Sequence, residues 1–299
     1  MNITTIGGHA RRWLDQGTRG RVAAVFDDGC YLRHRRQPLL CLMSRKRSPG
    51  PINLLYADED WDCRDAVRVG DRWECGTNVL RVGDASFRFH RAATWRAPAG
   101  ALDWTPRRLE EGLRRVADAS ESADTGILLP LALNRRARRP APLEARIARR
   151  ARLGVDAFRE WLADSLTEQP RAVEIPQDAE ALLGLGPGLT PAGDDFVVGM
   201  LVALHGLQLE ATAEVLAAWV KRKAGARTNE ISVAHLLAAC DGEASAPVHA
   251  VLNALIEPDQ PDLGERVHAL AALGHSSGWD ALGGVLTVCE ARTLRREVP

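Results

Sequence analysis

One glycine-rich segment, residues 184–195, combines residue types that are suited to binding an anion. It reads Gly-Leu-Gly-Pro-Gly-Leu-Thr-Pro-Ala-Gly-Asp-Asp, and an apolar helical pattern follows it. Glycine permits backbone angles that other residues avoid, and it lets a ligand approach the main chain. Thr190 is a favourable N-cap, and Pro191 suits the first helical position. Backbone N–H groups at such a helix start favour phosphate or carboxylate. The candidate substrate-binding residues of this turn are Gly186, Gly188, Leu189 and Thr190.

Two adjacent carboxylates, Asp194 and Asp195, belong to the first turn of the predicted helix. Negative charge there stabilises the helix but repels a bare anion. A Mg²⁺ ion between carboxylate and phosphate would remove this conflict, and so would an aspartate that accepts a proton. Both residues are therefore candidate catalytic groups and candidate Mg²⁺ ligands. Adjacent helical residues point about 100° apart, so we expect one of the two to face the ligand. The spacing matches neither the Walker A nor the Rossmann pattern, and a tight connection between helices would have a similar composition.

A second segment, residues 274–284, has the same kind of composition. It reads Gly-His-Ser-Ser-Gly-Trp-Asp-Ala-Leu-Gly-Gly. Ser276 or Ser277 is expected to cap a helix, and both hydroxyls are candidate ligands for a phosphate or carboxylate oxygen. His275 is a candidate general acid or base, although a histidine facing solvent in a turn would look the same.

A third helix start lies at residues 227–232, Arg-Thr-Asn-Glu-Ile-Ser. Arg227 could recognise a carboxylate or phosphate through its planar guanidinium group. Thr228 or Asn229 is expected to cap the helix, and Thr228 and Ser232 are four residues apart on one face. Arg227 and Thr228 are therefore further substrate-binding candidates, and a charged, capped helix start on the surface is the alternative.

The composition limits the classes of partner. The 299 residues include 39 basic and 39 acidic side chains, which gives no case for nucleic acid or an acidic membrane as the main partner. No stretch approaches the roughly 20 apolar residues that span a bilayer, and the first residues do not resemble a signal peptide. The six cysteines form no Cys-x-x-Cys pair. We therefore expect a cytoplasmic protein with reduced thiols.

The elements that would position these residues fall into two parts. Short apolar runs separated by turn residues predict strands in the first hundred residues, and helical spacing begins near Thr105. We expect an α+β protein, with a small antiparallel sandwich or barrel-like domain over residues 1–100 and an all-helical domain over residues 101–299. The predicted strands are 21–26, 31–34, 38–43, 52–56, 72–75, 79–82 and 86–90. The predicted helices are 11–15, 105–116, 142–166, 178–183, 191–207, 211–223, 230–240, 247–255, 263–273 and 279–294.

Taken together, segments 186–196 and 274–284 resemble the AllH family, which includes a subunit of oxamate carbamoyltransferase in allantoin degradation. The resemblance covers the C-terminal half well and the N-terminal half loosely. It implies an enzyme of three subunits that transfers a carbamoyl group from oxalurate to phosphate, giving oxamate and carbamoyl phosphate, or runs the reverse. It also implies companion subunits that resemble acyl-CoA synthetases. Phosphate, oxamate and carbamoyl phosphate are small anions, which agrees with the predicted turn.

Three functions are consistent with these residues. The first is an enzyme subunit that handles a carbamoyl or phosphoryl group, with the turn, Arg227 and the two serines around the anion. The second is a non-catalytic binding or assembly subunit, in which the turn docks a partner or senses a metabolite. The third is a metal-dependent hydrolase with Asp194, Asp195 and Asp280 as ligands.

Overall fold

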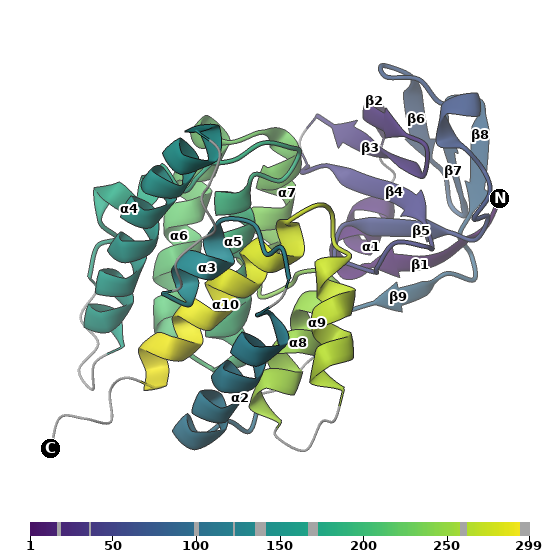
Figure 1. Ribbon diagram of the computed structural model, residues 1–299. Coiled ribbons are helices and arrows are strands. Elements are labelled where there is room, and N and C mark those ends of the chain that lie inside the picture. The colour runs from purple at the N-terminus through teal and green to yellow at the C-terminus, as the bar shows by residue number, and fades with distance from the viewer. Residues whose placement is uncertain are drawn as a thin grey trace, which may run out of the picture. The chain divides into compact units, whose positions relative to one another are not determined.

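A computed structural model describes residues 1–16, 19–35, 37–98, 102–121, 123–134, 142–166, 173–257 and 262–293. The chain divides into two compact units, Met1–Pro98 and Ala99–Pro299. The predicted boundary between residues 100 and 101 falls outside the described residues. Figure 1 shows strands in the first unit and helices in the second.

The first unit is one curled sheet of nine strands that forms a half-barrel. The strand order is β8-β7-β6-β2-β3-β4-β5-β1-β9, and neighbours are antiparallel except for β4 with β5 and β1 with β9. A short helix, α1 (Gly8–Leu14), follows the first strand, and a 3-10 turn, η1 (Cys63–Asp65), follows the fifth. The strands are β1 (Ile3–Gly7), β2 (Arg19–Phe26), β3 (Gly29–His34), β4 (Leu40–Ser44), β5 (Asn53–Tyr56), β6 (Arg72–Cys75), β7 (Val79–Val82), β8 (Ala85–Arg88) and β9 (Ala93–Trp95).

The core of this unit lies on the inner face of the sheet. Trp73, Tyr56 and Phe87 are among its largest fully buried side chains. In β6 and β8 buried and exposed residues alternate, as expected for strands with one covered face. The barrel-like β unit is thus confirmed, as a single sheet rather than two packed sheets. The predicted strands all correspond to observed ones, but the parallel pair of β1 and β9 was not predicted.

The second unit is helical. The region predicted as a helix at 178–183 is a 3-10 helix, η2 (Gln177–Ala181). Thr105 caps α2 as predicted, because its hydroxyl accepts a hydrogen bond from the N–H of Arg108 at 3.2 Å. The α-helices are α2 (Pro106–Ala119), α3 (Leu128–Ala132), α4 (Pro142–Ser165), α5 (Ala192–Gly206), α6 (Glu210–Arg227), α7 (Glu230–Ala239), α8 (Ala246–Ile256), α9 (Leu263–Ala271) and α10 (Ser277–Thr293).

Helices α5 and α10 form the centre of the second unit, side by side in Figure 1. Every residue of α5 from Gly193 to Leu204 is buried, and so is every residue of α10 from Gly278 to Cys289. Helices that are apolar on all sides belong in the interior. A β-carbon on Gly199 would lie 1.8 Å from the carbonyl oxygen of Ala281, so the two backbones touch at this point. This contact brings the N-terminal turns of both helices together.

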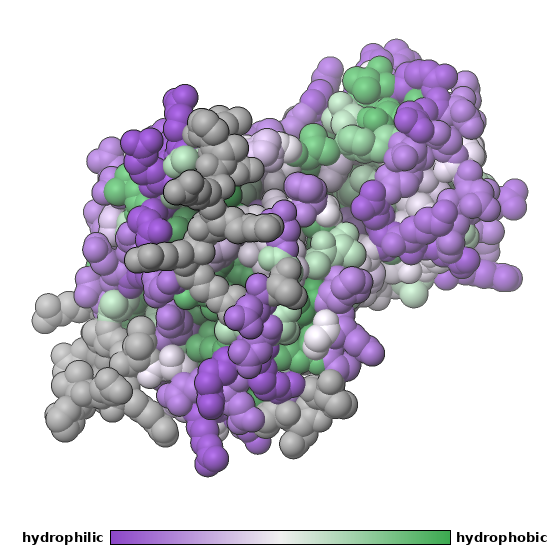
Figure 2. Space-filling model, in the orientation of Figure 1, coloured by the Kyte–Doolittle hydropathy of each residue, from purple (hydrophilic) through white to green (hydrophobic). Residues whose placement is uncertain are grey.

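The visible surface of the described residues is mainly polar. Figure 2 shows mostly hydrophilic side chains on the visible face, with scattered apolar patches. Among the described residues, no helix combines the length and the apolar character needed to cross a bilayer. All six cysteines are buried free thiols.

Candidate functional site

The glycine turn before α5 requires glycine at several positions. Gly184, Gly186 and Gly188 have φ angles of +72°, +117° and +98°, in the region that favours glycine. A β-carbon on Gly184 would lie 2.2 Å from the carbonyl oxygen of Arg227, and one on Gly193 would lie 1.9 Å from that of Leu182. At Gly188 nothing lies within 4 Å of this position. The ends of the turn are therefore closely packed, whereas its tip is open.

The start of α5 differs from the prediction. The helix begins at Ala192, and Pro191 occupies the N-cap position with an extended backbone, so Thr190 is not the cap and Pro191 is not the first helical residue. The N–H of Gly193 donates to the carbonyl oxygen of Leu185 at 3.0 Å, and those of Asp194 and Asp195 donate to Pro191. The prediction of free donors is therefore wrong for these three N–H groups. The carbonyl oxygen of Leu185 accepts one of them, and that of Pro191 accepts the other two.

Free donors lie in the turn itself instead. Among the described residues, the N–H groups of Gly186, Gly188, Leu189 and Thr190 have no acceptor. Pro187, Gly188 and Leu189 are exposed. The side-chain amide of Asn229 donates to the carbonyl oxygen of Leu189 at 2.9 Å and holds the tip of the turn. The turn thus presents backbone donors at a fixed, exposed loop.

The Asp194 carboxylate joins three segments of the chain. It accepts hydrogen bonds from the N–H of Gly184 at 2.8 Å, from the Ser232 hydroxyl at 2.7 Å and from the Thr228 hydroxyl. The side chain is 1% exposed, and burial raises its pKa while these donors oppose the rise. Thr228 and Ser232 both contact Asp194, but they do not share a helix face as predicted, because Thr228 has an extended backbone and precedes the N-cap of α7. Because these three donors occupy the carboxylate oxygens of Asp194, the pattern favours a positioning role for this residue.

Asp195 lies on the side of α5 that faces α10. It is 9% exposed, and one carboxylate oxygen, Oδ2, is buried without a hydrogen-bond partner among the described residues. Burial raises its pKa well above the ordinary value, and the neighbouring carboxylate of Asp280 raises it further. The hydroxyls of Ser277 and Thr190 partly oppose this rise. Burial and the neighbouring acid thus both favour the protonated form of Asp195.

Asp280, in the first turn of α10, is the second buried acid. It is 1% exposed, and within the described chain neither of its carboxylate oxygens has a hydrogen-bond partner. Burial raises its pKa to about 7, and the nearby Ser276 hydroxyl and Leu128 backbone, which lie outside hydrogen-bond geometry, oppose the rise. A carboxyl with a pKa near 7 can both donate and accept a proton in neutral solution. Such a shift in a buried, unpaired group is typical of functional sites.

The structure brings the predicted serines to the turn. The hydroxyl oxygens of Thr190 and Ser277 lie 2.9 Å apart, and both residues are partly exposed. Ser276 lies beside Gly126, where an added β-carbon would be 3.3 Å from that of Ser276 and 3.8 Å from Oδ1 of Asp280. His275 is exposed, and no hydrogen bond joins it to the described residues of this group. Thr190, Ser276 and Ser277 thus surround the two buried acids.

Arg227 is placed differently from its predicted role. Its guanidinium group forms an ion pair with Glu180, which also pairs with Lys223 at 2.8 Å. These contacts lower the pKa of Glu180, with Lys223 as the largest cause. The guanidinium group that was predicted to bind a substrate anion is therefore already paired with the carboxylate of Glu180. Asn229, not Thr228, caps α7, with its side-chain oxygen accepting from the N–H groups of Ile231 and Ser232.

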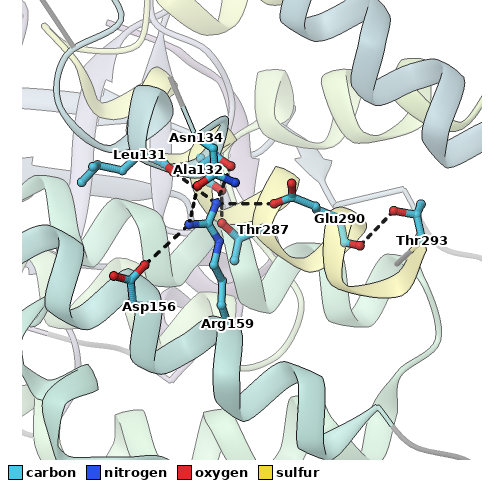
Figure 3. Close-up of polar contacts among 9 residues, drawn as sticks. Leu131, Ala132, Asn134, Asp156, Arg159, Thr287, Glu290 and Thr293 are labelled. Atoms are coloured by element: carbon cyan, nitrogen blue, oxygen red, sulfur yellow. Dashed lines mark hydrogen bonds and ion pairs between the residues drawn. The ribbon is translucent and has the colours of Figure 1, made fainter. Parts of the chain in front are cut away.

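An arginine of α4, which the sequence did not single out, holds the wall next to Asp280. Figure 3 shows the Arg159 guanidinium at the end of α3, where it donates to the carbonyl oxygens of Leu131 and Ala132 at 3.1 and 2.7 Å. It also forms an ion pair with Glu290 of α10 at 3.4 Å. Because α3 begins at Leu128, whose backbone faces Asp280, Arg159 positions the segment that covers this acid. This role could not be predicted from the sequence, because Arg159 is far along the chain from the residues that it contacts.

The described residues contain no group of three or more His, Cys, Asp and Glu side chains that could hold a metal ion. The proposed set of Asp194, Asp195 and Asp280 is therefore not supported as a metal centre by the geometry. A cavity of the described structure lies on the sheet of the first unit and includes no residue of the glycine turn.

Two family models match the chain. The model described as oxamate carbamoyltransferase subunit AllH matches residues 182–289, and the model described as AllH family N-terminal domain matches residues 2–94. Together they cover most of the chain. The first match spans the glycine turn, the start of α7 and nearly all of α10. No solved structure matches the chain.

Proposed function

The chain belongs to the AllH family, and from this premise we propose that it is the oxamate carbamoyltransferase subunit in which Asp195 and Asp280 exchange the proton of the reaction. The glycine turn would bind the small anionic substrate beside them. The subunit assignment follows the description of the family, whereas the roles of individual residues are our proposal.

One observation carries this proposal. Asp195 and Asp280 are buried together, with unpartnered carboxylate oxygens, next to the partly exposed hydroxyls of Thr190 and Ser277. Two unpaired carboxylates in the interior destabilise the fold unless they are protonated or have a ligand. A structural role would pair them, as Asp194 is paired. A catalytic role is therefore the best explanation for two unpaired, buried acids at the junction of two helices.

Carbamoyl transfer needs a proton at the atom that leaves. In the forward direction a phosphate oxygen forms a bond to the carbamoyl carbon of oxalurate, and the bond between that carbon and the oxamate nitrogen breaks. The nitrogen leaves with the bonding electron pair and takes a proton, which the carboxyl of Asp280 or Asp195 would supply. The free N–H groups of Gly186 and Gly188 would stabilise the negative charge that develops on the carbonyl oxygen.

The exposed side of the turn leaves room for companion subunits, which the resemblance to this family implies. We propose that such subunits, of the acyl-CoA synthetase type, cover the turn and exclude water from the reacting groups. A site completed by a partner would explain why the acids are preorganised in this chain while its turn is open to solvent. Exclusion of water strengthens each charge interaction in the site.

The test is carbamoyl transfer by the chain reconstituted with its companion subunits. Asp195→Asn and Asp280→Asn keep the shape of each side chain and remove its proton exchange, so we expect each to lower kcat by about 100-fold or more. Asp164→Asn, an exposed change in α4, is the matched control and should retain full turnover. Full turnover by both buried variants, with folding and assembly unchanged, would contradict the proposal.

A second function, as a non-catalytic assembly subunit, has one observation in its favour. Leu189 is 42% exposed at the tip of the turn, where Asn229 fixes its backbone. An apolar side chain in this position suits docking of a partner. Leu189→Ser should then weaken association with the companion subunits without changing the affinity of the isolated chain for oxamate or phosphate. If the isolated chain binds neither anion and yet assembles tightly, the assembly role is the better explanation.

A further inference from the structure

The curled sheet carries a basic cavity that is separate in sequence from the glycine turn. It has a volume of about 790 Å³ and is lined by residues of β2, β3 and β6 and the residue after β3. This volume lies within the range of about 300–1,000 Å³ that is usual for small-molecule sites. The charged residues in its wall are Arg19, Arg21, Arg33, Arg35, Arg72 and Glu74.

The strand register places these arginines on one face. Arg21 is the cross-strand partner of Arg72 on one side and of Arg33 on the other, so three arginines form a row across β6, β2 and β3. Arg19, two residues before Arg21, is the partner of Glu74. Side chains two residues apart in a strand point to the same face. Gly20 and the buried Trp73 alternate with these residues and point to the opposite, core-facing side of the strands, although the cavity also reaches them.

This arrangement is unfavourable for the empty protein. Like charges directly opposite each other in a sheet are destabilising. Glu74 lies outside this row, between Arg19 and Arg81 of β7, and among the described residues it forms no ion pair with an arginine of the row. Within the described chain, Arg19, Arg35 and Arg72 have no hydrogen-bond or ion-pair partner. Arg21 uses one N–H to donate to the carbonyl oxygen of Gly70 at 2.8 Å, which fixes it in place and leaves its other donors available.

We propose that this cavity binds a polyphosphate. A phosphate group accepts paired hydrogen bonds from a guanidinium group, and the five arginines of the wall carry more positive charge than one phosphate neutralises. Neighbouring strands are about 4.8 Å apart, so a row over three strands spans roughly 10 Å and suits a chain of linked phosphates. The ligand is either an inorganic polyphosphate or the phosphate chain of a nucleotide. Trp73 is 1% exposed, so it provides no open ring for a base to stack on.

The experiment measures binding of tripolyphosphate, ATP and orthophosphate to the full chain by calorimetry at low ionic strength. The double variant Arg19→Gln and Arg72→Gln removes two cations without a described partner. The double variant Arg91→Gln and Arg107→Gln removes the same charge at exposed positions outside the cavity and is the matched control.

We expect tripolyphosphate to bind the unchanged chain more tightly than orthophosphate does. The cavity variant should bind it about tenfold more weakly or worse, because two charge-assisted contacts are lost, while the control stays near the unchanged affinity. Without ligand, the cavity variant should melt at the same or a higher temperature, since repulsion is relieved. Tighter binding of ATP would support the proposal and identify a nucleotide as the source, and equal binding would identify the inorganic ligand.

Three results would overturn the proposal. One is no binding of tripolyphosphate or ATP at low ionic strength, and another is equal weakening in the two double variants, which would indicate a general charge effect. The third is tighter binding of a single-stranded RNA than of either phosphate ligand, with loss in the cavity variant. That result would assign the face to a nucleic acid, whose backbone also contacts arginines.

Discussion

The hydroxyls of Thr190 and Ser277 lie 2.9 Å apart, although 87 positions separate the two residues in the chain. The contact joins the glycine turn before α5 to the first residue of α10. Both hydroxyls also oppose the rise in the pKa of Asp195. Two segments with the same glycine, hydroxyl and aspartate composition therefore meet at one pair of acids, and the family match over residues 182–289 spans both.

The pKa of Asp280 makes the stability of the protein depend on pH. Burial raises it from 3.8 to about 7. Between these values the folded state holds a proton that the unfolded state has lost, so this group's contribution to the free energy of unfolding falls as pH rises. Asp280→Asn cannot ionise. We expect the variant to gain stability relative to the unchanged protein from about pH 4 to 7 and to keep a constant advantage above pH 7, up to about 4 kcal/mol.

Urea unfolding of both proteins across this pH range measures the difference, and other titrating groups largely cancel. Asp164→Asn, at an exposed position, is the matched control and should show only a small difference in stability. If the free energies of unfolding of Asp280→Asn and the unchanged protein differ by the same amount at every pH in this range, the raised pKa of Asp280 is contradicted.

Asp194→Ala tests the positioning role of this residue. The substitution leaves the N–H of Gly184 and the hydroxyls of Ser232 and Thr228 without their common acceptor. A buried donor without a partner costs about 1–3 kcal/mol, and Ser232 is buried whereas Gly184 and Thr228 are partly exposed, so we expect a loss of about 2–3 kcal/mol in the free energy of unfolding. Ser232→Ala, which removes one donor only, should cost about 1 kcal/mol. Equal stability of Asp194→Ala and the unchanged protein would show that these bonds do not hold the turn.

Most of the fold follows from local patterns in the sequence. The bounds of β6 and β7 agree with the prediction, because turn residues flank each strand and its side chains alternate between buried and exposed. The edge strand β9 has three residues and pairs in parallel with a strand near the other end of the unit. The helix α3 has five residues and includes Pro130. Such elements form through tertiary contacts, which local propensity does not encode.

The sequence indicates candidate residues for the site but not their contacts. Composition brought attention to the turn, to both serines and to both aspartates of α5. Which aspartate is satisfied depends on how α5 is rotated against α7 and α10, and close packing at Gly199 fixes that rotation. Two further contacts could not be predicted from local patterns. The ion pair of Arg227 with Glu180 is long-range, and the hydrogen bond from the N–H of Gly193 to the carbonyl oxygen of Leu185 depends on the conformation of the turn.

Two glycines of the turn should differ in their tolerance of alanine. Gly184→Ala places a β-carbon 2.2 Å from the carbonyl oxygen of Arg227, whereas Gly188→Ala meets nothing within 4 Å and only the unfavourable φ of +98°. We expect a loss of about 1 kcal/mol at Gly188 from the backbone angle alone, and of about 3 kcal/mol or more at Gly184. Thermal unfolding monitored by circular dichroism compares the two. A loss at Gly188 as large as that at Gly184 would mean that the tip of the turn is packed rather than open.

The close approach of α5 and α10 should be the least tolerant feature of the helical unit. Gly199→Ala puts a β-carbon 1.8 Å from the carbonyl oxygen of Ala281, so the helices must separate, and we expect a loss of about 3 kcal/mol or more. Gly225→Ala in α6 is the matched control, because nothing lies within 4 Å of its added carbon. Alanine there should be neutral or stabilise the helix by up to about 1 kcal/mol.

Separation of the two helices would also hydrate the acids at their N-terminal turns. Hydration lowers the pKa of a buried carboxyl toward its ordinary value. Gly199→Ala should therefore weaken the pH dependence of stability that Asp280 causes, while Gly225→Ala leaves it unchanged. Urea unfolding of both variants at several pH values distinguishes this outcome from simple destabilisation. A stable Gly199→Ala protein with an unchanged pH dependence would show that backbone contact at this glycine does not hold Asp195 and Asp280 in their dry environment.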